Sequence, residues 1–119
     1  MNPFDLLRTT DRRLGVRYSP RKDTMATCHR GTLGLGRDLA VSVLDLSDIG
    51  GRVVLHEPLD RGQVVEIGLL APGWSAAVKR LGVIVWLEET GIAGCEAGIL
   101  FSRSLEFNDL RDLCYLPEL

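Results

Sequence analysis

Residues 77–101, AVKRLGVIVWLEETGIAGCEAGILF, decide the fold, because they contain two runs in which apolar and polar side chains alternate. A period of two is typical of half-buried strands rather than helices. The turn formers Thr90 and Gly91 separate the two runs, so we expect antiparallel strands at Ala77–Glu88 and Gly94–Phe101. The alternating apolar positions are Val83, Val85 and Leu87, then Cys95, Ala97, Ile99 and Phe101.

The same pattern recurs four times before this hairpin, at Thr24–Arg30, Leu39–Leu46, Arg52–Glu57 and Gln63–Leu70. Short polar or glycine-rich segments connect these runs, and no helical pattern lies between them. Six short strands joined in this way favour an all-β fold, a six-stranded antiparallel β-barrel. Glycine-rich Gly31–Gly36 is interpreted as a flexible hairpin loop, since a strand follows where a phosphate-binding loop would precede a helix.

The end of the chain changes period. Residues 104–114 place four side chains on one helical face and predict a C-terminal helix with Ser104 as N-cap, stopped near Pro117. The apolar face comprises Phe107, Leu110, Leu113 and Cys114. A short apolar group around Phe4, Leu6 and Leu7 is too brief to assign.

The chain has 119 residues, of which 45% are hydrophobic and 25% charged, and this indicates one globular domain. We divide it into a basic arm, residues 1–23, and a barrel domain with its helix, residues 24–119. No apolar run approaches the roughly 20 residues that span a bilayer, and no signal-peptide pattern opens the chain, so we expect a cytoplasmic protein without membrane insertion. The three widely spaced cysteines favour neither disulfides nor zinc.

Charge is divided unevenly along the chain. Residues 1–37 hold eight basic and three acidic side chains, a balance of +5, whereas the remaining residues hold six basic and thirteen acidic ones, a balance of −7. A basic arm on an acidic body favours an anionic partner, although a solvated charged helix would give the same count.

Enzyme signatures are missing from the sequence. It has no nucleophile elbow, no P-loop and no zinc-protease motif, and its only histidines are His29 and His56. We therefore expect a non-enzyme with no metal and no cofactor. Nucleic-acid binding through the arm ranks third among the functions considered, because only seven aromatics are present and Trp86 and Phe101 are expected to face the core. The acidic body would also repel a polyanion.

Two motifs point to a ligand. Arg17 and Arg21 stand four apart in a segment that Pro20 keeps extended, and arginine forks match both phosphate oxygens and the O6/N7 edge of guanine. Asp45-Leu46-Ser47-Asp48-Ile49-Gly50 falls where a strand ends and turns. Taken alone, each motif is weak: such arginine spacing arises by chance, and Asp, Ser and Gly are ordinary turn residues.

Together, these motifs resemble the Arg-x-x-x-Arg and Asp/Asn-x-Ser-x-x-Gly pattern of the PilZ domain family, bacterial cytoplasmic receptors for the second messenger cyclic di-GMP. The resemblance implies that Arg17 and Arg21 bind the ligand, opposite Asp45, Ser47 and Gly50. Arg13 and Gly51 are further candidates, and upstream Arg8 and Arg12 leave the arginine register open. The order of a basic arm, a six-stranded barrel and a terminal helix fits the family too.

Cyclic di-GMP suits these residue types. Its phosphates and guanine edges call for arginines, and Asp45 can accept hydrogen bonds from guanine N1–H and N2–H₂, with the Ser47 hydroxyl as a donor. The expected function is therefore nucleotide-binding signal transduction, in which the arm becomes ordered over the ligand and changes a surface seen by an unidentified protein partner. The alternative is a PilZ-fold adaptor that binds proteins and ignores nucleotide.

Overall fold

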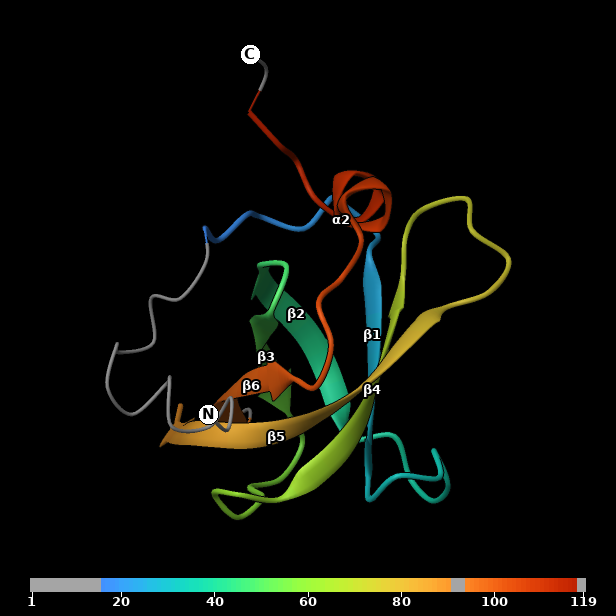
Figure 1. Ribbon diagram of the computed structural model, residues 1–119. Helices are drawn as coiled ribbons and strands as arrows, with labels where there is room; N and C mark the ends of the chain where they lie inside the picture. The colour runs from blue at the N-terminus through green and yellow to red at the C-terminus, as the bar shows by residue number, and fades with distance from the viewer. Residues whose placement is uncertain (1–15, 91–93, 118–119) are drawn as a thin grey trace.

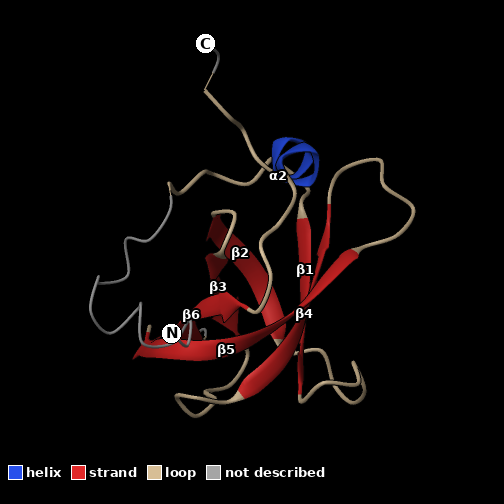
Figure 2. Cartoon of the chain, in the orientation of Figure 1, coloured by secondary structure: helices blue, strands red, loops and turns tan. Residues whose placement is uncertain are grey.

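The computed structural model describes residues 16–90 and 94–117, in which six strands precede one short helix (Figures 1 and 2). All six expected strands are confirmed, each within two residues of its expected ends. The elements are β1 (Met25–Arg30), β2 (Ala40–Leu46), β3 (Gly50–Leu55), β4 (Val64–Leu70), β5 (Val78–Glu89), β6 (Cys95–Phe101) and α2 (Phe107–Leu113).

The strands form one antiparallel sheet in the order β1-β4-β5-β6-β3-β2. The sheet curls until its edge strands β1 and β2 approach one another, which gives the nearly closed barrel that the sequence predicts. Asp38 joins the two edges, because its Oδ1 accepts hydrogen bonds from the backbone N–H groups of Cys28 (2.9 Å) and Ala40 (3.0 Å). Leu39 N–H also donates to the Cys28 carbonyl at 2.8 Å.

The barrel interior follows the alternation seen in the sequence. On β6, Ala97, Ile99 and Phe101 all point into the core, and Val65, Ile67 and Leu69 do the same on β4. All three cysteines are free and buried, so they belong to the interior of the fold rather than to its surface. Helix α2 contributes Leu110 and Leu113, which close one end of the core.

The alternation is interrupted in β5. The pairing of β5 with β6 shifts between Ile84 and Trp86, so Ile84 is 1% exposed while Val85 and Trp86 are only partly buried. The expectation that Trp86 faces the core is therefore wrong. The bulge turns this side chain onto the outer face of the barrel, whereas Phe101 faces the core as expected, at 5% exposure.

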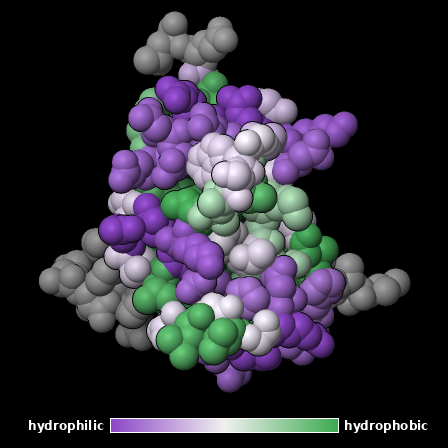
Figure 3. All heavy atoms as spheres, turned by 90° about the vertical axis from the view of Figure 1, so that its right-hand side faces the viewer, coloured by the Kyte–Doolittle hydropathy of each residue, from purple (hydrophilic) through white to green (hydrophobic). Residues whose placement is uncertain are grey.

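The segment Gly31–Gly36 is a loop, but it is not a hairpin. It crosses from β1 to β2, which are opposite edges of the sheet rather than hydrogen-bonded neighbours. The loop carries Leu33 and Leu35, which are 76% and 69% exposed. Figure 3 views the molecule from the side of β1 and β4, and apolar side chains gather at the lower end of this largely hydrophilic face, where Figure 1 places the β1–β2 loop.

Helix α2 begins later than the sequence suggests. Glu106 occupies the N-cap position without a side-chain capping bond, so the prediction of Ser104 as N-cap is wrong. The reason is tertiary: Leu105 is buried and its N–H donates to the Asp48 carbonyl at 2.6 Å, which keeps the chain extended until the core position is filled. Phe107 was expected on the apolar face but is 67% exposed.

The described part of the arm is held against the barrel. Tyr18 forms an isolated antiparallel bridge with Leu46, in which each N–H donates to the other's carbonyl, at 2.7 and 3.0 Å. Pro20 forms a second bridge with Cys114, just beyond α2. The arm thus pairs with the last residue of β2 and then crosses to the C-terminal segment. No helix in the described part of the chain has the length and apolar character needed to cross a membrane.

Candidate functional site

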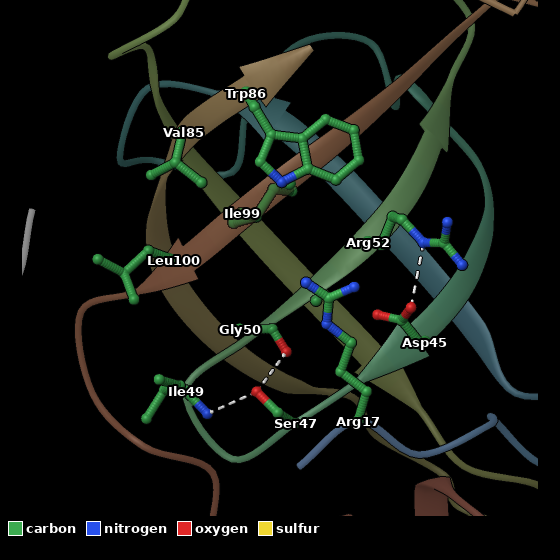
Figure 4. A pocket seen from close by; sticks show the side chains of 12 residues that line it. Arg17, Asp45, Ser47, Ile49, Gly50, Arg52, Val85, Trp86, Ile99 and Leu100 are labelled. Carbon is green, nitrogen blue, oxygen red and sulfur yellow. Dashed lines mark hydrogen bonds and ion pairs between the residues drawn. The ribbon is translucent and has the colours of Figure 1, made fainter. Parts of the chain in front are cut away.

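An open hollow lies on the outer face of the barrel, over strands β3, β6 and β5 (Figure 4). The arm contributes Arg17 to its wall, and the turn between β2 and β3 contributes Ser47 and Ile49. Of the residues proposed from sequence, the hollow brings together Arg17, Asp45, Ser47, Gly50 and Gly51. Residues separated by 28 positions in the chain therefore share one site, which neither motif alone could indicate.

Ser47 organises the turn from within. Its backbone N–H donates to the Gly50 carbonyl at 2.8 Å, its hydroxyl donates to the same carbonyl at 3.3 Å, and its Oγ accepts from Ile49 N–H at 3.3 Å. The residue is only 5% exposed. The hydroxyl that the sequence suggested as a ligand donor is thus engaged inside the turn, and Ser47 shapes the wall of the hollow.

Gly50 is required by close packing, and Gly51 is closely packed. A Cβ on Gly50 would overlap the Ile99 carbonyl oxygen on the neighbouring strand β6, and one on Gly51 would approach Leu46 Cδ2 to 2.8 Å. The group that approaches is strand β6, which sets the floor of the hollow.

Asp45 is paired with an arginine that the sequence interpretation missed. Arg52 Nε donates to Asp45 Oδ2 at 3.1 Å, and Arg52 NH1 lies 3.8 Å from Glu96 Oε2. The Asp45 side chain is 14% exposed and that of Arg52 is 38% exposed. Arg52 could have been found from sequence, because it follows Gly50 by two residues and so lies on the same face of β3. It adds a second guanidinium to the hollow.

Trp86 is the other residue that the sequence interpretation missed. It pairs across the strands with Gly98, and a Cβ at position 98 would overlap the five-membered ring of the indole at Nε1. The ring therefore covers the bare backbone of β6 and presents an aromatic surface to the hollow. Figure 4 shows the Arg17 guanidinium pointing into the hollow, between the Trp86 indole and the Asp45 carboxylate. The signal from which Trp86 could have been identified is a tryptophan that faces a glycine in the adjacent strand.

Arg17 and Arg21, which were predicted to act as a pair, lie in different places. Arg21 does not line the hollow; its Nε donates to the Arg111 carbonyl at 3.2 Å and its guanidinium carbon lies 5.1 Å from the centre of the Tyr115 ring. Arg21 thus holds the arm to α2 and the segment after it. Arg13, the alternative partner of Arg17, lies outside the described residues, as do Arg8 and Arg12.

The described thiols are unsuited to nucleophilic chemistry. Burial raises the pKa of Cys28 to about 12 and that of Cys114 to about 11, and it also raises the pKa of Cys95. A thiol with such a pKa stays protonated at neutral pH, and the thiolate is the reactive form. Among residues 16–90 and 94–117, no group of three or more His, Cys, Asp or Glu side chains is arranged to hold a metal ion.

No family model matches this chain, and no curated protein matches it. Function is therefore inferred from the residues and their geometry.

Proposed function

We propose that this protein is a PilZ-type receptor for cyclic di-GMP and that the ligand binds in the hollow on the outer face of the barrel. The observation that carries the proposal is the convergence of Arg17 from the arm with Asp45, Ser47 and Gly50 around one hollow. The order of arm, six-stranded barrel and C-terminal helix further supports it.

The groups around the hollow match the chemistry of a guanine dinucleotide. Arg17 and Arg52 offer guanidinium planes for the phosphates and for the O6/N7 edge of guanine. Trp86 offers a surface on which a base stacks, a contact worth about 1–3 kcal/mol per base. Asp45 accepts hydrogen bonds from guanine N1–H and N2–H₂, with Arg52 holding its carboxylate in place.

The second arginine of the pair is Arg13 rather than Arg21 in this proposal. Arg13 stands four residues before Arg17, the same spacing in the opposite direction, whereas Arg21 is bonded to Arg111 and stacked on Tyr115. Recruiting Arg21 to the hollow would cost those contacts. The register Arg13-x-x-x-Arg17 needs no such rearrangement of the described residues.

The arm also connects the hollow with α2, and this supports a signalling role. Tyr18 pairs with Leu46 beside Asp45, while Ser19 accepts a hydrogen bond from Tyr115 N–H at 2.9 Å and Arg21 N–H donates to the Leu113 carbonyl at 2.8 Å. A ligand that repositions Arg17 would therefore also displace the residues that follow it in the arm, which are hydrogen-bonded to the C-terminal segment. That segment and α2, which expose Tyr115 and Phe107, would form the surface seen by a protein partner.

Calorimetry with the full chain tests the proposal. Cyclic di-GMP should bind, while cyclic di-AMP, GMP and single-stranded DNA should bind at least about tenfold more weakly. Equal binding of cyclic di-AMP would mean that the hollow recognises phosphate without reading guanine. Preferred binding of DNA would instead favour a protein that binds nucleic acid through its basic arm.

A nucleotide-independent PilZ-fold adaptor is the second candidate, and one observation favours it. Several proposed ligand groups already have partners inside the protein: Ser47 is bonded within its turn, Asp45 is paired with Arg52, and Arg21 is bonded to α2. If cyclic di-GMP gives no heat and does not change the Trp86 emission, the receptor proposal is wrong and the adaptor remains.

A further inference from the structure

A row of side chains crosses the outer face of the barrel next to the hollow. The strand pairings place Gly50, Leu100, Val83 and Val64 opposite one another on β3, β6, β5 and β4. Directly opposite residues in antiparallel strands point to the same face. Because Ile99 and Phe101 point into the core, Leu100 between them points outward, and so does its partner Val83.

Two residues of this outer row are buried even though they lie outside the core cluster. Leu100 and Val83 are each 5% exposed, whereas Val64, the next residue in the row, is 40% exposed. Neighbours within a sheet cover the sides of an outward-facing side chain and leave its end open. Leu100 borders the hollow, but Val83 does not line it. A covering group must therefore lie over Leu100 and Val83.

The chain's own N-terminal segment has the composition and the reach to be that group. Its first seven residues include Phe4, Leu6 and Leu7, and basic residues begin only at Arg8. The chain re-enters the described structure at the rim of the hollow, since Arg17 lines it. The ten residue-to-residue steps from Leu7 to Arg17 span up to about 33 Å when extended, close to the longest dimension of the molecule, 37 Å.

We propose that the outer row Leu100–Val83 is the docking site for the N-terminal residues Phe4, Leu6 and Leu7. Burying these apolar side chains against the row supplies the hydrophobic free energy that a short, mostly charged segment lacks by itself. Docking would hold the segment at two places beside the hollow, at the outer row and at Arg17. The basic residues between these points, Arg8, Arg12 and Arg13, are then held along the mouth of the hollow.

Thiol labelling measures the covering directly. The native cysteines are buried, so they give a low background. A Val83→Cys chain should react with a thiol reagent at least about tenfold more slowly than a Met25→Cys chain, since Met25 is 62% exposed on β1. Adding Phe4→Ser, Leu6→Ser and Leu7→Ser should speed labelling at position 83 about tenfold and leave position 25 unchanged.

Unchanged labelling at position 83 after the three serine substitutions would overturn the proposal, because the row would then be covered by other parts of the protein. Leu100→Cys is the second reporter if Val83→Cys fails to fold, and the same acceleration is expected there. Neither measurement contains nucleotide. Failure of cyclic di-GMP to bind would therefore remove the proposed function and leave the docking result standing.

Discussion

The two faces of strand β6 are built by different rules. On the inner face, Ala97, Ile99 and Phe101 are all buried in the core, as simple alternation requires. On the outer face, Gly98 lies beneath the Trp86 indole and Leu100 borders the hollow. One face of the strand maintains the barrel, and the other forms the floor of the candidate site.

This difference shows which positions the alternation of apolar and polar residues along a strand can predict and which it cannot. An inner side chain needs only to be apolar and of the right size, so the alternating pattern of the surrounding sequence predicts it. The residue type at an outer position near the hollow depends on a residue of another strand. Gly98 has to be small because the Trp86 indole lies over it, and Gly50 because the Ile99 carbonyl oxygen lies close to it. The following experiments separate the two faces, since inner substitutions should affect stability and outer ones should affect binding.

Phe101→Ala on the inner face should have the largest effect. Truncating a buried phenylalanine removes its transfer free energy and leaves a cavity, a loss of about 3–5 kcal/mol in the free energy of unfolding. Urea denaturation monitors it. A loss below about 1 kcal/mol would mean that the inner face is not the tightly packed core described here.

The barrel could be predicted because its signals are local. Val65, Ile67 and Leu69 alternate within one strand, and turn formers separate the runs. The helix start could not be predicted, since it depends on a backbone bond from Leu105 to Asp48, which are distant in sequence. The same holds for the bulge that turns Trp86 outward.

The candidate site was predictable in part. Arg17, Asp45, Ser47 and Gly50 were named from sequence and share the hollow. The division between Arg17 and Arg21 was not predictable, because it is set by Tyr115 and the Arg111 carbonyl, at the far end of the chain.

Trp86→Ala on the outer face should mainly affect binding. Losing a stacking surface should weaken cyclic di-GMP by about 1–3 kcal/mol, roughly 5- to 150-fold. The free energy of unfolding should change less than in Phe101→Ala, since Trp86 is only partly buried. Calorimetry and urea denaturation report the two effects.

The second tryptophan provides the control for this variant. Trp74 donates from Nε1 to Asp112 at 3.3 Å, next to α2, and does not line the hollow. Trp74→Phe should therefore keep both the affinity and the ligand-induced change in fluorescence. Loss of that change in Trp74→Phe would locate the ligand elsewhere.

Asp45→Asn tests whether the acidic wall reads guanine. The amide keeps the shape but loses charge and acceptor strength, so affinity for cyclic di-GMP should fall by about 1–2 kcal/mol while weak binding of cyclic di-AMP should change little. Glu57→Gln is a matched control, since Glu57 pairs with Arg30 and Arg37 and does not line the hollow. An equal loss for both nucleotides would show that Asp45 acts only by holding Arg52.

The smallest effect concerns the thiols inside the barrel. Burial raises the pKa of Cys28 to about 12, above the value of about 8.5 for an unfolded thiol. The folded state therefore keeps its proton where the unfolded state loses it. The stability that this thiol contributes is complete below about pH 8.5 and falls as pH rises toward 12.

At pH 9.5 the loss is on the order of 1 kcal/mol for such a thiol. Urea denaturation at pH 7.5 and 9.5 should therefore show a smaller pH-dependent loss in Cys28→Ala than in wild type. Identical losses in the two proteins would mean that Cys28 is not buried as a protonated thiol.

The central claim is that Arg17, and not Arg21, belongs to a cyclic di-GMP site. Calorimetric titration of wild type, Arg17→Ala and Arg21→Ala with cyclic di-GMP tests it most directly, because the two variants remove the same side chain from one arm, four residues apart. Arg17→Ala should lose about 1.5–3 kcal/mol of binding, roughly 10- to 150-fold, and Arg21→Ala should stay within about threefold of wild type. Tight binding by Arg17→Ala, or an equal loss in both variants, would contradict the account.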